Sequence, residues 1–290
     1  MTSDPTTPTA WGIRLSKLWG PRFPVDVRQI ALQYSAQRFD DPIHAIKEAD
    51  VGGRFEGALF PLNKRNGWAI LYNPKIASAG RINFTLGHEL GHYLCHRLQN
   101  AGGFECSEQG VLGFDRDEAR RNLEREADVF ASYLLMPIDD FRDQVRDQPL
   151  TMELMAHCAN RYGVSLTAAC VKWIEFTPMR AALVWADNGR VLWGRRSGAA
   201  KKQGVYFPLG MELPVGSLAA RGPSIGDPDR AGVKLPAGVW QRREAVTEFT
   251  IFSDRYEATI SLLLIDERDF SGWHQEEDVE DTFDRFTRNR

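Results

Sequence analysis

The sequence predicts an α+β fold in which two α+β units are joined by a short helical segment. Three observations predict it. Apolar residues recur at helical intervals over 84–96 and 122–137, which indicates two helices that each bury one face. Two apolar segments flank a turn-rich stretch near residue 65, as in a hairpin. From about residue 180 the apolar residues alternate with a period of two, which is typical of strands.

Length, composition and charge set the class of protein. The chain has 290 residues, enough for a large core or two domains, with 43% apolar and 26% charged residues, as in ordinary globular proteins. The net charge of −3 does not favour a nucleic-acid binder, because such domains are usually strongly basic. No stretch approaches 18 apolar residues, so we expect no membrane span.

The cysteines and the first residues favour a cytoplasmic protein. The four cysteines form no C-x-x-C pair and suggest no disulfide framework, so a reducing compartment is the simplest context: Cys95, Cys106, Cys158 and Cys170. Residues 1–10 lack the basic-then-apolar order of a signal peptide. Because these residues are rich in Thr, Pro and Ser, we expect them to be disordered.

The first elements are a helix and a hairpin. Pro24 can open a helix over about 24–38, where apolar residues form one stripe. The apolar segments 54–60 and 68–72 flank a turn-rich stretch and predict a β-hairpin.

The first strand of this hairpin has two interpretations. If its edge is exposed, an extended substrate could pair with its backbone at Gly57, Ala58 and Leu59. Equally, the two strands form a purely structural pair whose edge is covered. The sequence alone leaves both interpretations open.

The run FTLGHELGHYLCH, residues 84–96, contains the pattern H-E-x-x-H on a helix that we expect to start near Ser78. His88 and His92 are four residues apart, so both imidazoles lie on one face and can bind one metal ion. Glu89 can then reach water held at that point, which is how a zinc hydrolase places two ligands and a general base.

The alternative without a function is a helix with two surface histidines. A second segment, residues 122–137, argues against it. Residues 122–137 form a helical pattern that ends at Pro137. Within it, Glu124 and Asp128 are four apart and share a face. Glu124 fits a third metal ligand, and Asp128 fits a group that holds a ligand imidazole by its other N–H. Glu126 should point elsewhere.

The segments RINFTLGHELGHYL (81–94) and EREADVFASYLLMP (124–137) resemble the ImmA/IrrE-like zinc metallopeptidases, and most of all their radiation-response members of the IrrE/PprI type. The resemblance implies a zincin-like domain with zinc, or manganese in its place, bound by His88, His92 and Glu124. It implies Glu89 as the catalytic base, and a small helix-turn-helix repressor as the cleaved partner.

The same resemblance extends toward the C-terminus. FTPMRAALVWADNGRVLWGRR (176–196) and GVYFPLGMELPVGS (204–217) resemble the start of a GAF-like domain. Such a domain could bind a small-molecule effector, or it could be purely structural. Together these features divide the chain into a disordered N-terminus (1–10), a zinc metallopeptidase domain (11–140), a helix-turn-helix-like segment (141–178), a GAF-like sensor domain (179–275) and a charged tail (276–290).

Residues 148–176 predict two short helices, about 151–161 and 165–176, that flank a Tyr-Gly-Val turn. The arrangement resembles a DNA-binding helix-turn-helix. However, the second helix is apolar and offers Lys172 as its single cation, which is too few to neutralise phosphates. The sequence therefore disfavours direct DNA binding, and we expect these helices to pack on the peptidase unit.

The C-terminal unit reads as a sheet with loops. Apolar segments flank Asn188-Gly189, the strongest short hairpin signal. Further strands are expected at 203–208, 246–253 and 257–265, a helix or loop at 214–222, and a loop at 223–238.

Several other residues near the motif have less specific interpretations. His96 lies too far along the helix to join His88 on one ion, so we interpret it as a support for a ligand or a surface residue. Cys95 is expected to be a small buried residue, and Tyr93 to turn away from the metal. The linker 98–119 is either a mobile flap or a passive connector. The remaining histidines carry no ligand spacing: His44, His157 and His274.

The sequence therefore predicts a zinc endopeptidase that cleaves a helix-turn-helix repressor and so derepresses stress or DNA-damage genes. The alternative from another class is a non-catalytic regulator that binds a repressor or ligand and uses zinc structurally. The donor that would stabilise the developing oxyanion is not assigned from the sequence.

Overall fold

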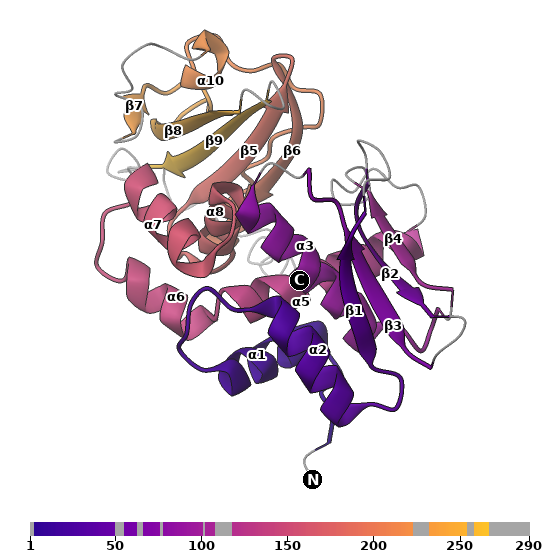
Figure 1. Cartoon of the computed structure of the whole chain (residues 1–290). Coiled ribbons are helices and arrows are strands. Elements are labelled where there is room, and N and C mark those ends of the chain that lie inside the picture. The colour runs from indigo at the N-terminus through magenta and orange to yellow at the C-terminus, as the bar shows by residue number, and fades with distance from the viewer. Residues whose placement is uncertain are drawn as a thin grey trace, which may run out of the picture.

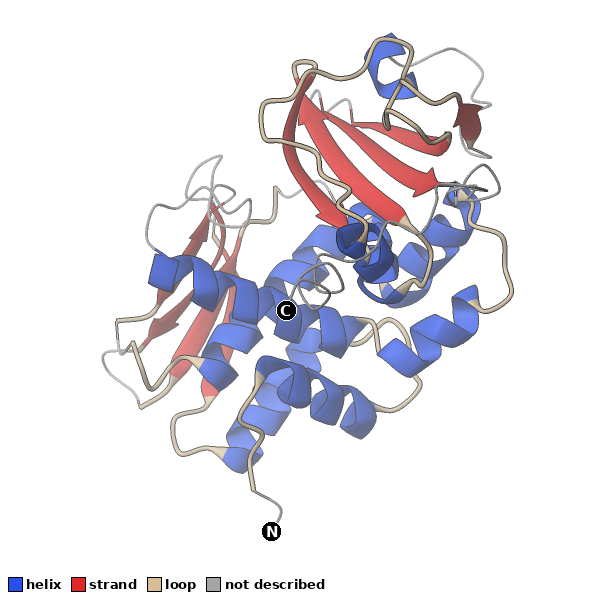
Figure 2. Ribbon diagram, turned by 180° about the vertical axis from the view of Figure 1, so that it is seen from behind, coloured by secondary structure: helices blue, strands red, loops and turns tan. Residues whose placement is uncertain are grey.

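The computed structural model describes residues 3–49, 55–62, 66–75, 78–100, 102–107, 118–222, 232–253 and 258–266. Within this part of the chain, two β-sheets are separated by a group of helices (Figure 1), so the α+β prediction is confirmed. The view from behind shows the same three regions (Figure 2).

The first helix, α1 (Pro8–Trp19), begins inside the segment that was expected to be disordered. Thr7 accepts a hydrogen bond from the backbone N–H of Ala10, and Pro8 occupies the start of the helix, where its missing N–H costs nothing. Trp11 and Leu15 are buried. The prediction of disorder over 1–10 is therefore wrong for residues 8–10, because a capping residue followed by proline is a strong local start signal.

Helix α2 (Val27–Arg38) confirms the helix predicted over about 24–38 but begins three residues later than expected. Asp26 caps it by accepting from the backbone N–H of Gln29 at 2.9 Å. Pro24 therefore precedes the helix and does not open it.

The first sheet confirms the predicted hairpin and corrects the interpretation of its edge. Strands β2 and β3 are antiparallel, with Gly57 opposite Tyr72 and Pro61 opposite Trp68. In the order β1-β3-β2-β4, β2 is paired on both sides, so the exposed edge proposed at Gly57, Ala58 and Leu59 is wrong and the covered strand is right. The strands are β1 (Ile43–Glu48), β2 (Phe55–Pro61), β3 (Trp68–Tyr72) and β4 (Phe104–Ser107).

Strand β4 comes from the linker 98–119, which the sequence suggested was a flap or a connector. Its residues 104–107 pair antiparallel with β2, so this part is a strand of the sheet. Residues 108–117 lie outside the part of the chain that the structure describes.

The central helices agree with the sequence. Helix α3 follows Ser78, as predicted, and α5 ends before Pro137. The pair α7 and α8 flanks Gly163, which adopts the left-handed conformation (φ 59°) that closes a helix. The helices are α3 (Ala79–Cys95), α5 (Glu118–Leu135), α6 (Ile138–Val145), α7 (Met152–Tyr162) and α8 (Leu166–Phe176).

The second sheet is antiparallel, with strand order β6-β5-β9-β8-β7. Asn188 and Gly189 have positive φ and turn the chain between β5 and β6, as predicted. The elements of this region are β5 (Ala181–Asp187), β6 (Arg190–Arg196), α9 (Gly198–Lys202), α10 (Leu218–Arg221), β7 (Val233–Leu235), β8 (Val246–Ser253) and β9 (Ala258–Ile265).

Two of the C-terminal predictions need correction. The strand expected at 203–208 is a loop: Val205 and Phe207 are buried in alternation, but the N–H of Val205 bonds back to Ala200 instead of to a strand. The loop expected at 223–238 contains β7, and residues 223–231 lie outside the described residues. The same holds for the charged tail 276–290 and for His274.

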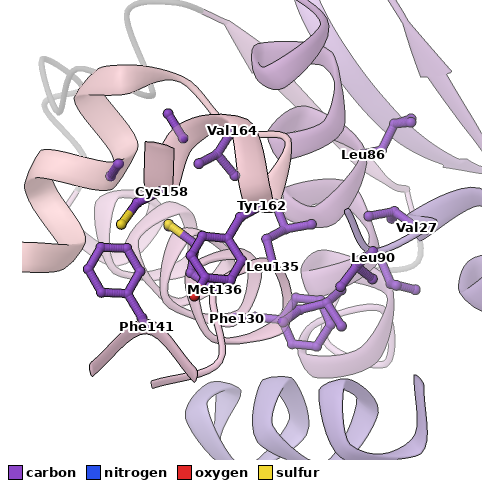
Figure 3. Close-up of a cluster of buried hydrophobic side chains, with 14 of the residues drawn as sticks. Val27, Leu86, Leu90, Phe130, Leu135, Met136, Phe141, Cys158, Tyr162 and Val164 are labelled. Carbon is purple, nitrogen blue, oxygen red and sulfur yellow. The ribbon is translucent and has the colours of Figure 1, made fainter. Parts of the chain in front are cut away.

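One large apolar cluster runs from α1 to β9 and holds the helices to both sheets. Figure 3 labels ten of its members, including Leu90 of α3, Phe130 of α5 and Tyr162 of α7. A smaller cluster covers the opposite face of the second sheet, under α9 and α10. Among the described residues, no helix is both long and apolar enough to cross a membrane.

Candidate metal centre

The candidate site begins with the H-E-x-x-H residues of α3. They lie in the middle of a helix of 17 residues, so the backbone around them is held by the helix on both sides. Glu89 and His92 are fully buried, and His88 is 3% exposed. The alternative of a helix with two surface histidines is therefore wrong.

Glu124 of α5 joins the two histidines. The Nε2 atoms of His88 and His92 are 3.0 Å apart, and the Nε2 of His88 lies 3.2 Å from Oε2 of Glu124. The Nε2 of His92 lies 3.6 Å from Oε1 of Glu124. Glu124 as a residue is only 5% exposed. The structure thus brings together the three residues that the sequence singled out as ligands.

Small residues let the two helices approach closely enough for this convergence. A Cβ atom at Gly91 would lie 3.0 Å from the ring of Phe130 and 3.1 Å from Cα of Ala127. One turn earlier, a Cβ at Gly87 would lie 3.3 Å from Cβ of Ala131. Sequence reasoning missed this seam, although two glycines four residues apart inside the motif were its visible signal.

The spacing of these atoms fits a zinc ion. Ligand atoms about 2.0–2.1 Å from zinc in a tetrahedral arrangement lie roughly 3.3 Å from one another. The two Nε2 atoms are 3.0 Å apart and Oε2 of Glu124 is 3.2 Å from Nε2 of His88, both close to this value, while the 3.6 Å contact of His92 is to Oε1 of Glu124. Two imidazoles and a carboxylate also form the donor set of catalytic zinc sites that keep a further position for water.

Burial and hydrogen bonding set the protonation of the site. Burial is the main cause that lowers the pKa of His92 to about 4, which keeps this imidazole neutral near pH 7. Burial alone would raise the pKa of the Glu124 carboxyl, but its close contacts with His88 and His92 outweigh burial and lower the pKa far below its usual range. Both groups therefore have the charge state that a metal ligand needs.

Glu89 lies against the first sheet. Its carboxylate is next to Gly57 of β2, where a Cβ atom would come within 2.7 Å of Oε1 of Glu89 and of Cγ2 of Thr85. The sequence had suggested Gly57 as a substrate-pairing residue. Because Gly57 has no side chain, it leaves the space in which the Glu89 side chain lies.

Two further groups hold the histidines from outside. Oδ1 of Asp128 lies 2.9 Å from Nδ1 of His88, which is the contact expected from the sequence. On His92, the equivalent contact is made by His96, whose Nδ1 is 3.0 Å from Nδ1 of His92. His96 is fully buried and lies 2.9 Å from Glu126, so the surface interpretation of His96 is wrong. Glu126 is not among the three converging ligands, as predicted, and contacts His96 instead.

Strand β4 contributes an aromatic ring that the sequence did not indicate. The ring of Phe104 stacks on that of His92, with centroids 4.4 Å apart and planes 16° from parallel. Tyr93 turns away, as predicted, and its hydroxyl donates to the carbonyl of Asp41. Cys95 is partly buried.

The other candidates lie apart from the site. His44 contacts the carbonyl of Asn66, and His157 contacts Gln144. Lys172, the cation weighed for DNA binding, is fully buried against the ring of Tyr133, 3.6 Å from its centroid. It cannot reach a phosphate from this position.

Comparisons with known proteins place this site in context. Residues 48–173 match the family model of the IrrE N-terminal-like domain, Peptidase_M78. A search of curated proteins gave no match. A solved structure described as a Mycobacterium tuberculosis transcriptional regulator is similar with a TM-score of 0.55 and 13% sequence identity, covering 89% of this chain and 76% of that one. At this identity the likeness concerns the fold alone.

Proposed function

Because residues 48–173 match the IrrE N-terminal-like domain, Peptidase_M78, we propose that the protein is a zinc-dependent endopeptidase of this family. The observation that carries the proposal is the convergence of two imidazole nitrogens and a carboxylate from two helices that are distant in sequence. We propose His88, His92 and Glu124 as the zinc ligands, with Asp128 holding His88.

Zinc is the ion that this donor set suits best. Imidazole and carboxylate together favour zinc, and manganese can replace it at sites rich in oxygen ligands. A bound zinc ion would supply Lewis acidity toward the scissile carbonyl and toward the attacking water.

Glu89 is the proposed general base. Glu89 directly follows His88 and its carboxylate is fully buried. In this role an Oε atom would take a proton from water and pass it to the leaving nitrogen. The carboxylate lies next to Gly57, on the side of α3 that faces strand β2. The buried surroundings strengthen each of its interactions with developing charge.

We propose a helix-turn-helix transcriptional repressor as the substrate, in a stress or DNA-damage response. The match to the family model supports it, and the similar solved structure is described as a transcriptional regulator. The burial of Lys172 disfavours direct reading of DNA by α8, so regulation through a protein partner is the simpler route.

The C-terminal sheet is a candidate sensor domain. One face of this sheet lies away from the central helices. On that face the sheet forms its own apolar cluster together with α9 and α10. The other face belongs to the large cluster that also contains the metal helices. We propose that this region is GAF-like and can bind a small-molecule effector.

A cleavage assay tests the proposed function. The full-length protein is mixed with the repressor encoded nearest to its gene, with zinc or manganese, and the products are followed by mass spectrometry. Glu89→Gln keeps the shape of the side chain, so it should still bind zinc but lose cleavage. Cleavage that survives Glu89→Gln would contradict the assigned base.

The burial of all three proposed ligands favours one alternative, a non-catalytic regulator with a structural zinc ion. Cobalt substitution separates the two, since an open site changes its visible spectrum when a small anion such as azide is added. A spectrum that azide leaves unchanged, together with no proteolysis of any repressor, would favour the structural role.

A further inference from the structure

We propose that His96 is a positioning residue that orients the ring of His92, so that Nε2 of His92 faces the zinc site. The inference rests on the proposed metal centre and assigns a role to two residues outside it, His96 and Glu126. Neither residue has the spacing of a metal ligand, and the three proposed ligands are complete without them.

Two contacts in series connect the proposed ligand His92 to helix α5. His96 follows His92 by one helical turn, and its ring is fully buried. Its Nδ1 atom lies 3.0 Å from Nδ1 of His92, and its Nε2 atom lies 2.9 Å from Oε2 of Glu126 on α5.

Hydrogen-bond chemistry decides which atom donates and which accepts in each of these two contacts. A carboxylate only accepts, so the Nε2 atom of His96 carries the proton that it donates to Glu126. In a neutral imidazole the other nitrogen then accepts, so Nδ1 of His96 receives the proton of Nδ1 of His92. His92 is thereby held in the tautomer whose Nε2 lone pair points at His88 and Glu124.

The two ligand histidines are therefore supported differently. Asp128 reaches Nδ1 of His88 directly, at 2.9 Å. For His92 the corresponding acid is Glu126 of α5, and His96, one helical turn after His92, bridges the gap. Phe104 stacks on the face of the His92 ring and restrains its tilt, while the bond to His96 sets its rotation.

The arrangement explains why three acids alternate along α5. Glu124 contacts His88 and His92, Asp128 contacts His88, and Glu126, which lies between the two acids in the sequence, contacts His96. Groups that orient a metal-bound imidazole typically change metal affinity by roughly 10- to 100-fold when they are removed. His96 should therefore matter for zinc affinity even though it does not bind the ion.

The test measures zinc affinity by competition with a chromophoric chelator, using the full chain. His96→Leu removes the acceptor and keeps much of the volume, and should weaken zinc binding roughly 10- to 100-fold. His96→Asn places an amide oxygen near the position of Nδ1 and should restore most of the affinity. His157→Leu makes the same exchange at a histidine that contacts Gln144, away from the site, and should leave the affinity unchanged.

A second measurement needs no variant and so does not depend on folding. In the zinc-loaded protein with ¹⁵N-labelled histidine, NMR should show His92 with its proton on Nδ1 and His96 with its proton on Nε2. The opposite tautomer of His96 would overturn the inference, as would equal zinc affinities of the wild type and a folded His96→Leu protein. If the wild type binds no zinc, the proposed function falls as well, so the two failures are distinguishable.

Discussion

The carboxylate of Glu89 lies in the space that a side chain at Gly57 would need. A Cβ atom at position 57 would come within 2.7 Å of Oε1 of Glu89, closer than two such atoms can approach. Gly57 lies on an internal strand that pairs with β3 and β4, so the strand cannot easily move away. The position of the proposed base therefore depends on a glycine in another element.

The first prediction is that Gly57→Ala displaces Glu89 and lowers peptidase activity roughly 100-fold, because a shift of about 1 Å in a catalytic group costs about that much. Zinc affinity should stay nearly unchanged, since the ligands lie on α3 and α5. Steady-state cleavage and chelator competition measure both effects. Gly198→Ala is the matched control, because a Cβ there meets no atom within 4 Å. Full activity of Gly57→Ala would refute the prediction.

Gly91→Ala should separate the metal helices. The added methyl group would press on Phe130 and Ala127 of α5, and overpacking of this kind costs about 1–3 kcal/mol. We expect a lower free energy of unfolding in urea and weaker zinc binding, because Glu124 would move away from the histidines. If the variant is as stable as the Gly198→Ala control and binds zinc equally well, the helices do not depend on this close contact.

Zinc should stabilise the folded protein. A ligand that binds only the folded state at 100 times its Kd raises the free energy of unfolding by about 2.7 kcal/mol. Urea unfolding with and without zinc measures the difference, and addition of a chelator should reverse it. The gain should disappear in His88→Ala. A gain that persists in His88→Ala would place the ion elsewhere.

The acid stability of the helical region should depend on Asp140. This residue accepts two hydrogen bonds from Arg161 and one from Tyr162, and the bonds from Arg161 are the main cause that lowers the pKa of its carboxyl. Because the folded pKa is below the unfolded one, the stabilisation is present above about pH 4, near the ordinary value for Asp, and is lost as the pH falls through the folded pKa.

Asp140→Asn tests this dependence. The variant should unfold more easily at pH 7, by about 1–3 kcal/mol for hydrogen bonds to a charged group. The difference from the wild type should shrink as the pH falls below about 4, where the carboxyl of the unfolded wild type becomes protonated before that of the folded protein. A difference that is the same at pH 3 and pH 7 would show that the charge of Asp140 is not its cause.

The metal helices could be predicted from the sequence because the information is local. His88, Glu89 and His92 lie within five residues, and the period of the helix decides which of them share a face. The same holds for Glu124 and Asp128. Their meeting across two helices was a hypothesis based on the kind of chemistry that such residues perform.

The features that escaped prediction depend on contacts between distant segments. The stacking of Phe104 on His92 requires β4 to pair with β2, and the acid-rich, weakly periodic linker gave no sign of that strand. The clearance at Gly57 likewise appears only when the sheet packs on α3. The start of α1 is a different case, because Thr7 and Pro8 were a readable local signal that the overall composition of residues 1–10 obscured.

The uninterrupted apolar cluster also limits where the chain can be cut. The first turn of α3 rests on the turn between α7 and α8: Asn83 donates to the carbonyl of Gly163, and Gly80 leaves room for Val164. A fragment that ended at residue 140 would lack this support. It would also expose apolar residues of α3, the helix that carries His88. Shorter versions of the protein that are meant to stay active should therefore retain both α7 and α8.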